Sequence, residues 1–228
     1  MIYITGDTHG QIDFGKLLST KLMDLTVNDY VIICGDCGVL FFPDEKEKMI
    51  EMYSSLPFTI LFVDGNHENF ELLKGYPIEH WHGGKVHRLS DTLIHLMRGQ
   101  VFELEGYTFF TFGGGLSIDK AFREPGISWW SEEMPTDEEL EEGLKNLAQH
   151  GNKVDFVLTH DCPTSIESLV GLYTWKQIKH TKSNEVLEKC KEGLAYTHWY
   201  FGHYHFDRRL SEKFTCLYKN IIRILPKK

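Results

Sequence analysis

The sequence predicts an α/β protein, because short apolar runs of strand length alternate with stretches that have the periodicity of amphipathic helices. The chain has 228 residues, of which 42% are hydrophobic, and this is enough to bury a substantial core. Neither a sequence repeat nor a Pro/Ser-rich linker interrupts the pattern. We therefore expect a single domain that covers residues 1–228.

Five apolar runs are rich in Ile, Val, Phe and Tyr, and each stops abruptly at a polar cluster. These runs are Ile2–Thr5, Tyr30–Cys34, Thr59–Val63, Phe156–Thr159 and His198–Phe201. Continuous apolar runs of this length are typical of strands that are covered on both faces, as in a sheet sandwiched by helices.

Helical patterns lie between these strands, and the clearest one covers Thr136–His150. It follows Pro135, begins with a capping box in Thr136-Asp137-Glu138-Glu139, and meets a C-terminal stop at Gly151. The other expected helices are Phe14–Met23, Asp44–Leu56, Glu68–Lys74 and Ser183–Gly193.

The middle of the chain has a different pattern, with strand-like segments separated by short turns. We expect an antiparallel meander from Val86–Leu89, Leu93–Leu96, Val101–Leu104 and Tyr107–Phe112. Further strands are expected within Phe214–Ile224. The long segment Gly113–Pro135 is either a lid or a packed surface loop.

Composition and charge exclude several classes of function. The formal net charge of −9 is unfavourable for an extended grip on duplex nucleic acid. Five scattered cysteines, an odd number, suit a reducing compartment better than a disulfide framework. The N-terminus has no secretory pattern, and no run approaches the roughly 18 apolar residues of a membrane span. We expect a cytoplasmic protein without a membrane partner.

Each of the five strands is followed by residues of metal-ligand type. The clusters are Gly6-Asp7-Thr8-His9-Gly10, Gly35-Asp36-Cys37-Gly38, Gly65-Asn66-His67-Glu68, His160-Asp161 and Gly202-His203-Tyr204-His205. Loops at the carboxyl edge of an α/β sheet converge on one crevice, so residues far apart in the sequence can meet there. Ordinary solvated or core histidines are the alternative, but their position after successive strands favours ligation.

The candidate ligands combine carboxylates, one amide and imidazoles. They are Asp7, His9, Asp36, Asn66, His160, His203 and His205. Such a set favours divalent Mn, Fe, Zn or Co over Mg or Ca. Two ions about 3.5–4 Å apart need a shared ligand, and Asp36 is the candidate for the bridging carboxylate.

The order of these motifs, from Gly6 to His205, resembles that of the calcineurin-like metallophosphoesterase superfamily. The resemblance implies a four-layer α-β-β-α sandwich of two mixed sheets flanked by helices. It implies two divalent metal ions as cofactors. Their ligands would be Asp7, His9, Asp36 and His205 for one ion, and Asp36, Asn66, His160 and His203 for the other.

The implied activity is hydrolysis of phosphate mono- or diesters. A hydroxide that bridges the two metals would attack phosphorus in line with the leaving group. The histidine that matches His67 points in the family at the leaving group or stabilises the charged transition state. The substrate would be a small organic phosphate or a nucleotide.

The chain departs from the family pattern after Asp36. Many members have a second Asp three residues after the bridging one, where it can orient the motif histidine, but this chain has Val39 there. Ser/Thr protein phosphatases continue with Arg-Gly, whereas this chain continues with Leu40-Phe41. The departure argues against a protein phosphatase.

Candidate substrate contacts come from the loop before Pro135. Arg123 of this loop can clamp a phosphate with its planar guanidinium. Further basic candidates outside the loop are Arg98, Arg208 and Arg209. Trp129 and Trp130 either stack on a flat group of the substrate or pack onto the domain.

Other motifs have simpler interpretations. Cys34 and Cys37 have zinc-site spacing without a second pair, so we expect core residues. We interpret Asp161 as a turn residue, and the group His80, Trp81, His82 and His87 as surface. A non-catalytic metal-binding scaffold on the same fold and a hydrolase of C–N or C–O bonds stay as alternative functions.

Overall fold

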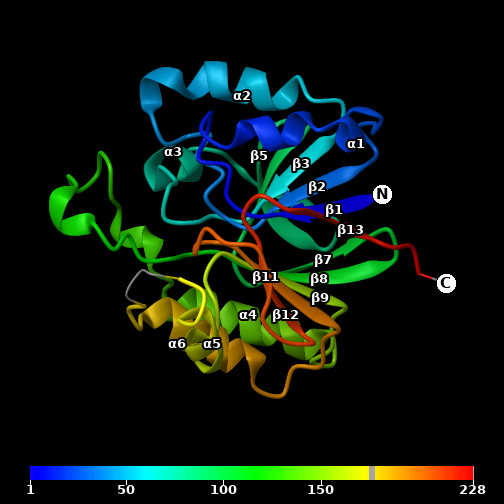
Figure 1. Cartoon of the computed structure of the whole chain (residues 1–228), viewed down its shortest axis with the longest axis vertical. Helices are drawn as coiled ribbons and strands as arrows, with labels where there is room; N and C mark the ends of the chain where they lie inside the picture. Colours follow the sequence, from blue (N-terminus) through cyan, green and yellow to red (C-terminus); the bar gives the residue numbers. More distant parts are fainter. Residues whose placement is uncertain (175–177, 228) are drawn as a thin grey trace.

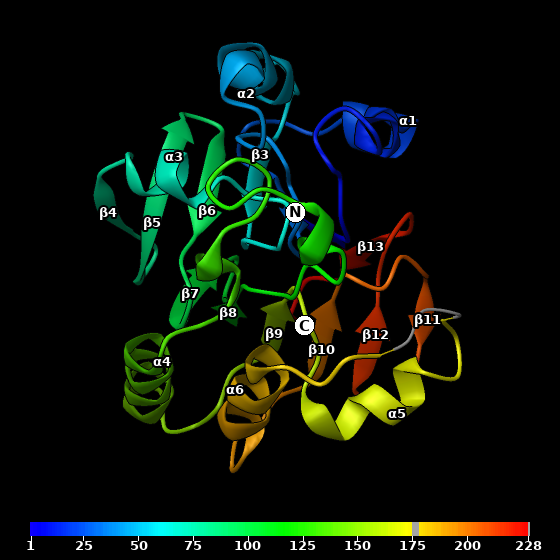
Figure 2. The ribbon, with the colours of Figure 1, turned by 90° about the vertical axis from the view of Figure 1, so that its left-hand side faces the viewer.

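Two β-sheets pack face to face, and helices cover the outer face of each sheet (Figures 1 and 2). The computed structural model describes residues 1–174 and 178–227. In Figure 1, α1 (Thr20–Met23), α2 (Lys46–Ser54) and α3 (Phe70–Lys74) lie above the sheets. On the opposite side lie α4 (Asp137–Gln149), α5 (Glu167–Val170) and α6 (Lys182–Lys191). The expected four-layer α-β-β-α sandwich is therefore confirmed.

The first sheet has seven strands in the order β13-β1-β2-β3-β6-β5-β4. Their bounds are β1 (Ile2–Thr5), β2 (Tyr30–Ile33), β3 (Thr59–Phe62), β4 (Ile78–Trp81), β5 (Gly84–Ser90), β6 (Leu93–Leu96) and β13 (Ile221–Ile224). The four central strands β1, β2, β3 and β6 are parallel, and the outer strands pair antiparallel. The three predicted strands of this half are confirmed.

The second sheet has six strands in the order β11-β12-β10-β9-β8-β7. Their bounds are β7 (Gln100–Leu104), β8 (Tyr107–Phe112), β9 (Phe156–Thr159), β10 (His198–Phe201), β11 (Arg208–Arg209) and β12 (Phe214–Cys216). Strands β8, β9, β10 and β12 are parallel. The carboxyl ends of β9 and β10 therefore share one edge of this sheet.

The four segments predicted as one meander instead belong to two sheets. Strands β5 and β6 form a hairpin in the first sheet, where β6 also pairs in parallel with β3. Strands β7 and β8 form a hairpin in the second sheet. The prediction of a single meander is wrong because local turn signals identify hairpins, whereas the partner on a hairpin's other edge is chosen by contacts distant in sequence.

The predicted helices are present, with shifted ends. The capping box of α4 is confirmed: the Thr136 hydroxyl accepts a hydrogen bond from the backbone N–H of Glu139 at 3.1 Å, and the Glu139 carboxylate accepts one from the N–H of Thr136 at 2.8 Å. The first predicted helix is divided into a 3-10 turn, Phe14–Leu18, and α1. Within the described residues, no helix has the length and apolar character that crossing a bilayer requires.

Three apolar layers hold the sandwich together, and strand alternation assigns residues to them. On β2, Val31 and Ile33 face the helices above, whereas Ile32 and Cys34 face the space between the sheets. The second sheet packs its outer face on α4 and α6 in the same way. Cys34 and Cys37 are buried in two different layers, in agreement with the core interpretation.

The interpretation of His87 as a surface residue is wrong. His80 and His82 are exposed, but His87 is buried and stacks on His95 with ring centroids 5.3 Å apart. The adjacent residues Val86 and His87 are both buried, so both faces of β5 are covered at this point.

A buried ion pair joins the two halves of the fold. The guanidinium of Arg98, which is 8% exposed, contacts the Asp64 carboxylate through Nε at 2.9 Å and Nη2 at 2.5 Å. Its Nη1 atom contacts Glu139 of α4 at 3.0 Å. The Arg98 charge keeps the pKa of the Asp64 carboxyl below its usual value although burial opposes the ionised form. Arg98 therefore links the end of β3, in the first sheet, to α4, which covers the second sheet.

We expect Arg98→Met to lower the free energy of unfolding by about 3–5 kcal/mol, because it leaves the buried Asp64 charge without its partner. Arg88→Met, which removes the more exposed pair with Glu79, is the matched control and should cost less than about 1 kcal/mol. Urea denaturation measures both. Equal losses of unfolding free energy in the two variants would contradict the expectation that the buried ion pair matters more than the exposed one.

Candidate active site

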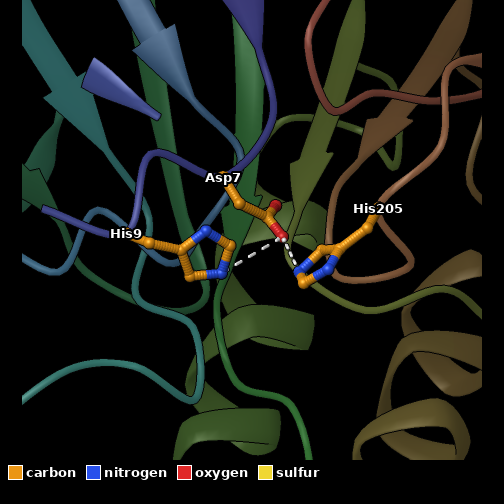
Figure 3. A group of neighbouring side chains, drawn as sticks. All are labelled: Asp7, His9 and His205. Carbon is orange, nitrogen blue, oxygen red and sulfur yellow. Dashed lines mark ion pairs between the residues drawn. The ribbon is translucent and has the colours of Figure 1, made fainter. Parts of the chain in front are cut away.

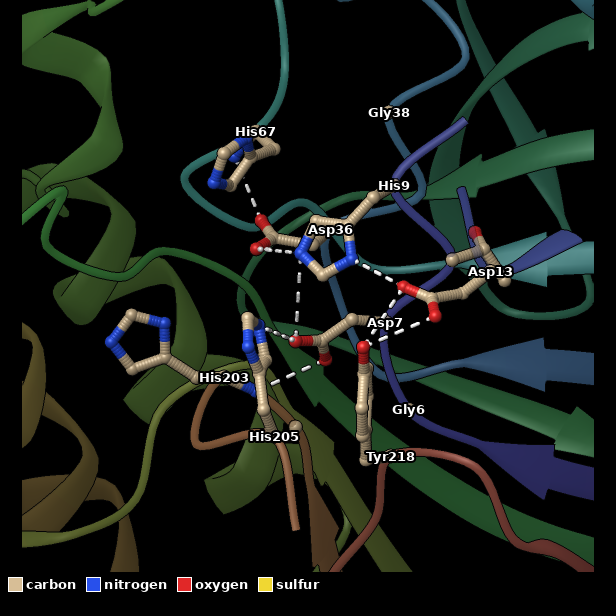
Figure 4. A network of polar contacts seen from close by, with 12 residues as sticks. Gly6, Asp7, His9, Asp13, Asp36, Gly38, His67, His203, His205 and Tyr218 are labelled. Atoms are coloured by element: carbon tan, nitrogen blue, oxygen red, sulfur yellow. Dashed lines mark hydrogen bonds and ion pairs between the residues drawn. The ribbon is translucent and has the colours of Figure 1, made fainter. Parts of the chain in front are cut away.

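The candidate ligands meet at the carboxyl edge of both sheets. Asp7 and His9 follow β1, Asp36 follows β2 and Asn66 follows β3, all in the first sheet. From the second sheet, His160 follows β9, and His203 and His205 follow β10. Figure 4 shows side chains from loops of both sheets turned toward one another. The site therefore spans the junction between the sheets.

The backbone is strained where it presents several of these side chains. Four of the candidate ligands have positive φ angles, a region that residues other than glycine rarely adopt. These angles are 45° at His9, 49° at Asp36, 69° at His203 and 55° at His205. Such outliers persist where the surrounding structure over-determines them, and they gather at functional sites.

Two glycines allow the loops to approach the buried carboxylates. A Cβ atom at Gly65 would lie 2.1 Å from Oδ1 of Asp36, and one at Gly202 would lie 2.2 Å from Oδ1 of Asp7. Both distances are far shorter than any tolerated contact, so these positions require glycine for the close approach.

One group of potential ligands consists of Asp7, His9 and His205 (Figure 3), with donor atoms within 4.8 Å of one another. Oδ2 of the fully buried Asp7 lies 3.2 Å from Nε2 of His205 and 4.0 Å from Nε2 of His9. This oxygen accepts no hydrogen bond from the residues that the structure describes. A buried carboxylate oxygen in this state fits a metal ligand.

Asp13 and Tyr218 support two of the histidines from behind (Figure 4). Nδ1 of His9 lies 2.9 Å from Oδ2 of Asp13, which leaves Nε2 facing the site. The Tyr218 hydroxyl donates to Asp13 at 3.1 Å, and the Tyr218 ring stacks on His205 with centroids 4.8 Å apart. Such outer partners fix the orientation of metal-binding imidazoles. Sequence reasoning missed both; Asp13 lies four residues after His9 in the sequence, but Tyr218 carries no local signal.

Lys16 ties the β1 loop to the segment before β13. Its ammonium donates hydrogen bonds to the carbonyls of Gly6, Asp7 and Tyr218 at 2.8, 2.6 and 2.6 Å. Burial lowers the pKa of this amine to about 8 despite the nearby acidic groups. The loop that carries Asp7 is thus anchored through its backbone to the segment before the last strand.

A second group consists of Asp36, His160 and His203, joined by Asn66. Nδ1 of His160 donates a hydrogen bond to the Cys34 carbonyl at 3.0 Å, so Nε2 faces the site. That Nε2 atom lies 3.1 Å from Oδ1 of Asn66, 3.1 Å from Nδ1 of His203 and 3.3 Å from Oδ1 of Asp36.

Asp36 lies between the two groups. Its Oδ1 faces His160 and accepts the backbone N–H of His67 at 2.7 Å, whereas its Oδ2 lies 3.4 Å from Nε2 of His9. A carboxylate with one oxygen toward each group has the arrangement that a bridging ligand requires.

The electrostatics of the site favour positive charge. Burial disfavours the protonated form of His160, but the Asp36 and Asp7 carboxylates outweigh it and raise the pKa of His160 to about 10. The pKa of His9 rises to about 9 against burial because of Asp36, Asp7 and Asp13. This negative potential and the mixed oxygen and nitrogen donors fit divalent metal ions.

His67 lies at the side of the two groups, with its ring centroid 5.1 Å from that of His9. Its Nε2 lies 3.3 Å from Nη2 of Arg123, and burial lowers its pKa. Val39 is completely buried in the core, so its position contributes only packing. Arg123, held by Asp119 at 2.8 Å, is instead the charged neighbour of this histidine.

The tryptophans and the other arginines lie in different surroundings. Trp130 is 3% exposed and packs edge-on against Phe41. Of the two alternatives for this residue, the structure therefore favours packing onto the domain. Trp129 is half-buried, with the ammonium of Lys120 5.3 Å from its ring. Arg98 belongs to the buried ion pair with Asp64, so its interpretation as a phosphate contact is wrong. Arg208 and Arg209 are exposed on the short strand β11.

A cavity of about 260 Å³ lies beside the candidate ligands. Asp36, Asn66, His67, His203 and His205 form its inner wall. Its outer wall includes residues that sequence reasoning missed, namely Leu116, Ile118, Asp119, Asp161, Ile178, Lys179, Thr181 and Tyr204, together with Arg123. Oδ1 of Asp161 accepts the backbone N–H of Cys162 at 2.7 Å, a local contact of the kind a turn residue makes, and also the Tyr204 hydroxyl at 2.5 Å and the Asn184 amide at 2.9 Å.

Comparison with solved structures finds distant similarity. A protein of unknown function from Aquifex aeolicus is 14% identical over 86% of this chain and 87% of its own, with a TM-score of 0.38. A phosphopantetheinyl hydrolase from Mycobacterium tuberculosis is 15% identical over 95% of this chain and 87% of its own, with a TM-score of 0.45. No curated protein shows a significant sequence match.

A family model gives the assignment. The model of the calcineurin-like phosphoesterases matches residues 1–207, which include every strand-end motif described above. The match agrees with the four-layer fold and with groups of Asp and His side chains able to hold metal. The chain therefore belongs to the calcineurin-like phosphoesterase family and is a metal-dependent phosphoesterase.

Proposed function

We propose that the protein hydrolyses small phosphate mono- or diesters with two divalent metal ions. Asp7, His9, Asp36 and His205 would hold one ion, and Asp36, Asn66, His160 and His203 the other. The observation that carries this proposal is the position of Asp36, whose two oxygens face donors of two separate groups, His9 in one and His160 in the other. Mn, Fe, Zn and Co all suit this donor set.

The metal ions would supply Lewis-acid polarisation of the phosphoryl oxygens and a water of lowered pKa as nucleophile. The protein's own contribution is to fix the donors. Asp13 orients His9, the Cys34 carbonyl orients His160, and Tyr218 supports His205 by stacking. These contacts keep the site rigid before substrate arrives, and preorganisation of this kind lowers the cost of reaching the transition state.

His67 and Arg123 are the proposed groups for the leaving oxygen and the phosphate. Both line the 260 Å³ cavity, and their side chains lie 3.3 Å apart. A guanidinium next to an imidazole can bind a phosphoryl oxygen while the imidazole exchanges a proton with the leaving group. Trp129 keeps a half-buried position nearby on the same loop and remains a proposed substrate contact, whereas Trp130 would act by holding Phe41.

The proposed substrate is small, because the cavity has a volume of about 260 Å³ and the chain is acidic. Two basic side chains, Arg123 and Lys179, line the cavity and suit a compact anion. A net charge of −9 opposes binding of extended duplex nucleic acid. We also propose a cytoplasmic location, which the five free, buried cysteines support.

We expect Asp36→Asn to lower both metal content and rate, because it removes a negative charge that both ions would share. Metal-stripped protein is reloaded with Mn²⁺, metal per chain is measured by mass spectrometry, and p-nitrophenyl phosphate and its bis ester are assayed. The wild type should bind two ions, and the variant fewer, with kcat/KM at least about 100-fold lower. Asp44→Asn, at an exposed site, is the matched control. Normal turnover with two ions in Asp36→Asn would refute the ligand assignment.

We expect His67→Ala to lower kcat by about 100-fold or more while two metal ions stay bound, because the side chain would exchange a proton rather than ligate. The pH dependence of kcat should lose one ionisation. The pKa of His67 is lowered by burial, so this ionisation should lie below the usual histidine range, with the neutral form above it. The control is His80→Ala, which changes an exposed histidine. Loss of a metal ion from His67→Ala would instead make His67 a ligand.

A further inference from the structure

A second cavity, of about 380 Å³, lies on the other side of His67. Its wall includes His9, a candidate metal ligand, and His67, which lies beside the two ligand groups. Gly10, Ile12, Phe41 and Met49 from the neighbouring loops and α2 complete it. In Figure 4, His67 and Gly38, which also lines this cavity, lie at the top of the network, whereas His203 lies at the lower left. His67 thus separates two cavities, and both adjoin the site.

The two cavities differ in chemistry. The first contains Arg123 and Lys179, but none of the described residues that line the second is Lys or Arg, and its one carboxylate is that of Glu45. Phe42, at 60% exposure, and Ile12, at 81%, present apolar surface at its edge. A cavity lined largely by Ile12, Phe41, Phe42 and Met49 favours an uncharged apolar group.

The aromatic wall is preformed. Val39 and Leu40 are buried and anchor the segment after Asp36 in the core. The Phe41 ring is packed against three other rings, those of Phe42, His67 and Trp130, with centroids 4.9, 5.4 and 5.9 Å away. Val39 and Leu40 therefore fix the segment whose next two residues, Phe41 and Phe42, form this wall.

We propose that the second cavity binds an uncharged aromatic or hydrocarbon substituent of the phosphoester. This inference rests on the proposed function and adds the class of substrate. A phosphoryl group at the metal centre would have its substituent within reach of His67, and the apolar wall of Phe41, Phe42 and Met49 would remove that substituent from water. The volume of about 380 Å³ falls in the range of sites for small organic ligands.

The test compares phenylphosphonate with methylphosphonate, which carry the same charged group and cannot be hydrolysed as esters. Binding to the full-length, Mn²⁺-loaded protein is measured by calorimetry. Phenylphosphonate should bind at least about tenfold more tightly to the wild type. Phe42→Ser and Ile12→Ser should each reduce this ratio several-fold. Phe122→Ser, at a 94% exposed position of another loop, should keep it.

The outcomes separate this inference from the proposed function. A ratio near one in the wild type, no binding of either phosphonate, or a ratio that Phe42→Ser and Ile12→Ser leave unchanged would overturn the inference. In parallel, turnover is measured with p-nitrophenyl phenyl phosphate and p-nitrophenyl methyl phosphate, which share a leaving group. Turnover of both esters without a binding preference would leave the proposed function standing alone. A binding preference without turnover of these diesters or of the monoester p-nitrophenyl phosphate would overturn the proposed function and retain the cavity's selectivity.

Discussion

The burial of two carboxylates, Asp7 and Asp36, at the junction of the sheets is the constraint on which the site depends. Ionised carboxylates lose several kcal/mol of hydration when buried, unless charged or hydrogen-bonding partners replace water. Here the backbone N–H groups of His203 and His67 and the surrounding imidazoles provide those partners. The strained loops and the glycines Gly65 and Gly202 allow these partners to approach. The negative potential that results is what makes the site suitable for metal ions.

This constraint also explains why the supporting residues lie outside the motifs. A histidine that ligates through one ring nitrogen needs its other nitrogen held, and Asp13 and the Cys34 carbonyl do this from behind. Tyr218 serves His205 by stacking and Asp13 by a hydrogen bond. Lys16 in turn fixes the carbonyls around Asp7 and Tyr218. The geometry of the centre thus depends on the segment between β12 and β13, which carries Tyr218, as well as on the loops that carry the ligands.

The sequence allowed the strands and the location of the site to be predicted, because apolar runs end where polar motifs begin and parallel strands share an edge. It did not allow the pairing of β6 with β3, since that contact is non-local and leaves no trace in the turn between hairpins. Nor did the sequence allow the burial of His87 and Trp130 to be predicted. A histidine or tryptophan in a short segment can face the core or the solvent without changing the local sequence pattern. Arg98 shows the same limit, since its carboxylate partners come from distant segments.

The division of donors between the sheets has a consequence for synthesis of the protein. The oxygen donors Asp7, Asp36 and Asn66 all follow strands of the first sheet, whereas three of the four imidazoles follow strands of the second. A nascent chain that has emerged only as far as β8 holds the oxygens without those imidazoles. The centre can be completed only when β10 docks beside β9, so a truncated product of translation carries an incomplete and inactive site.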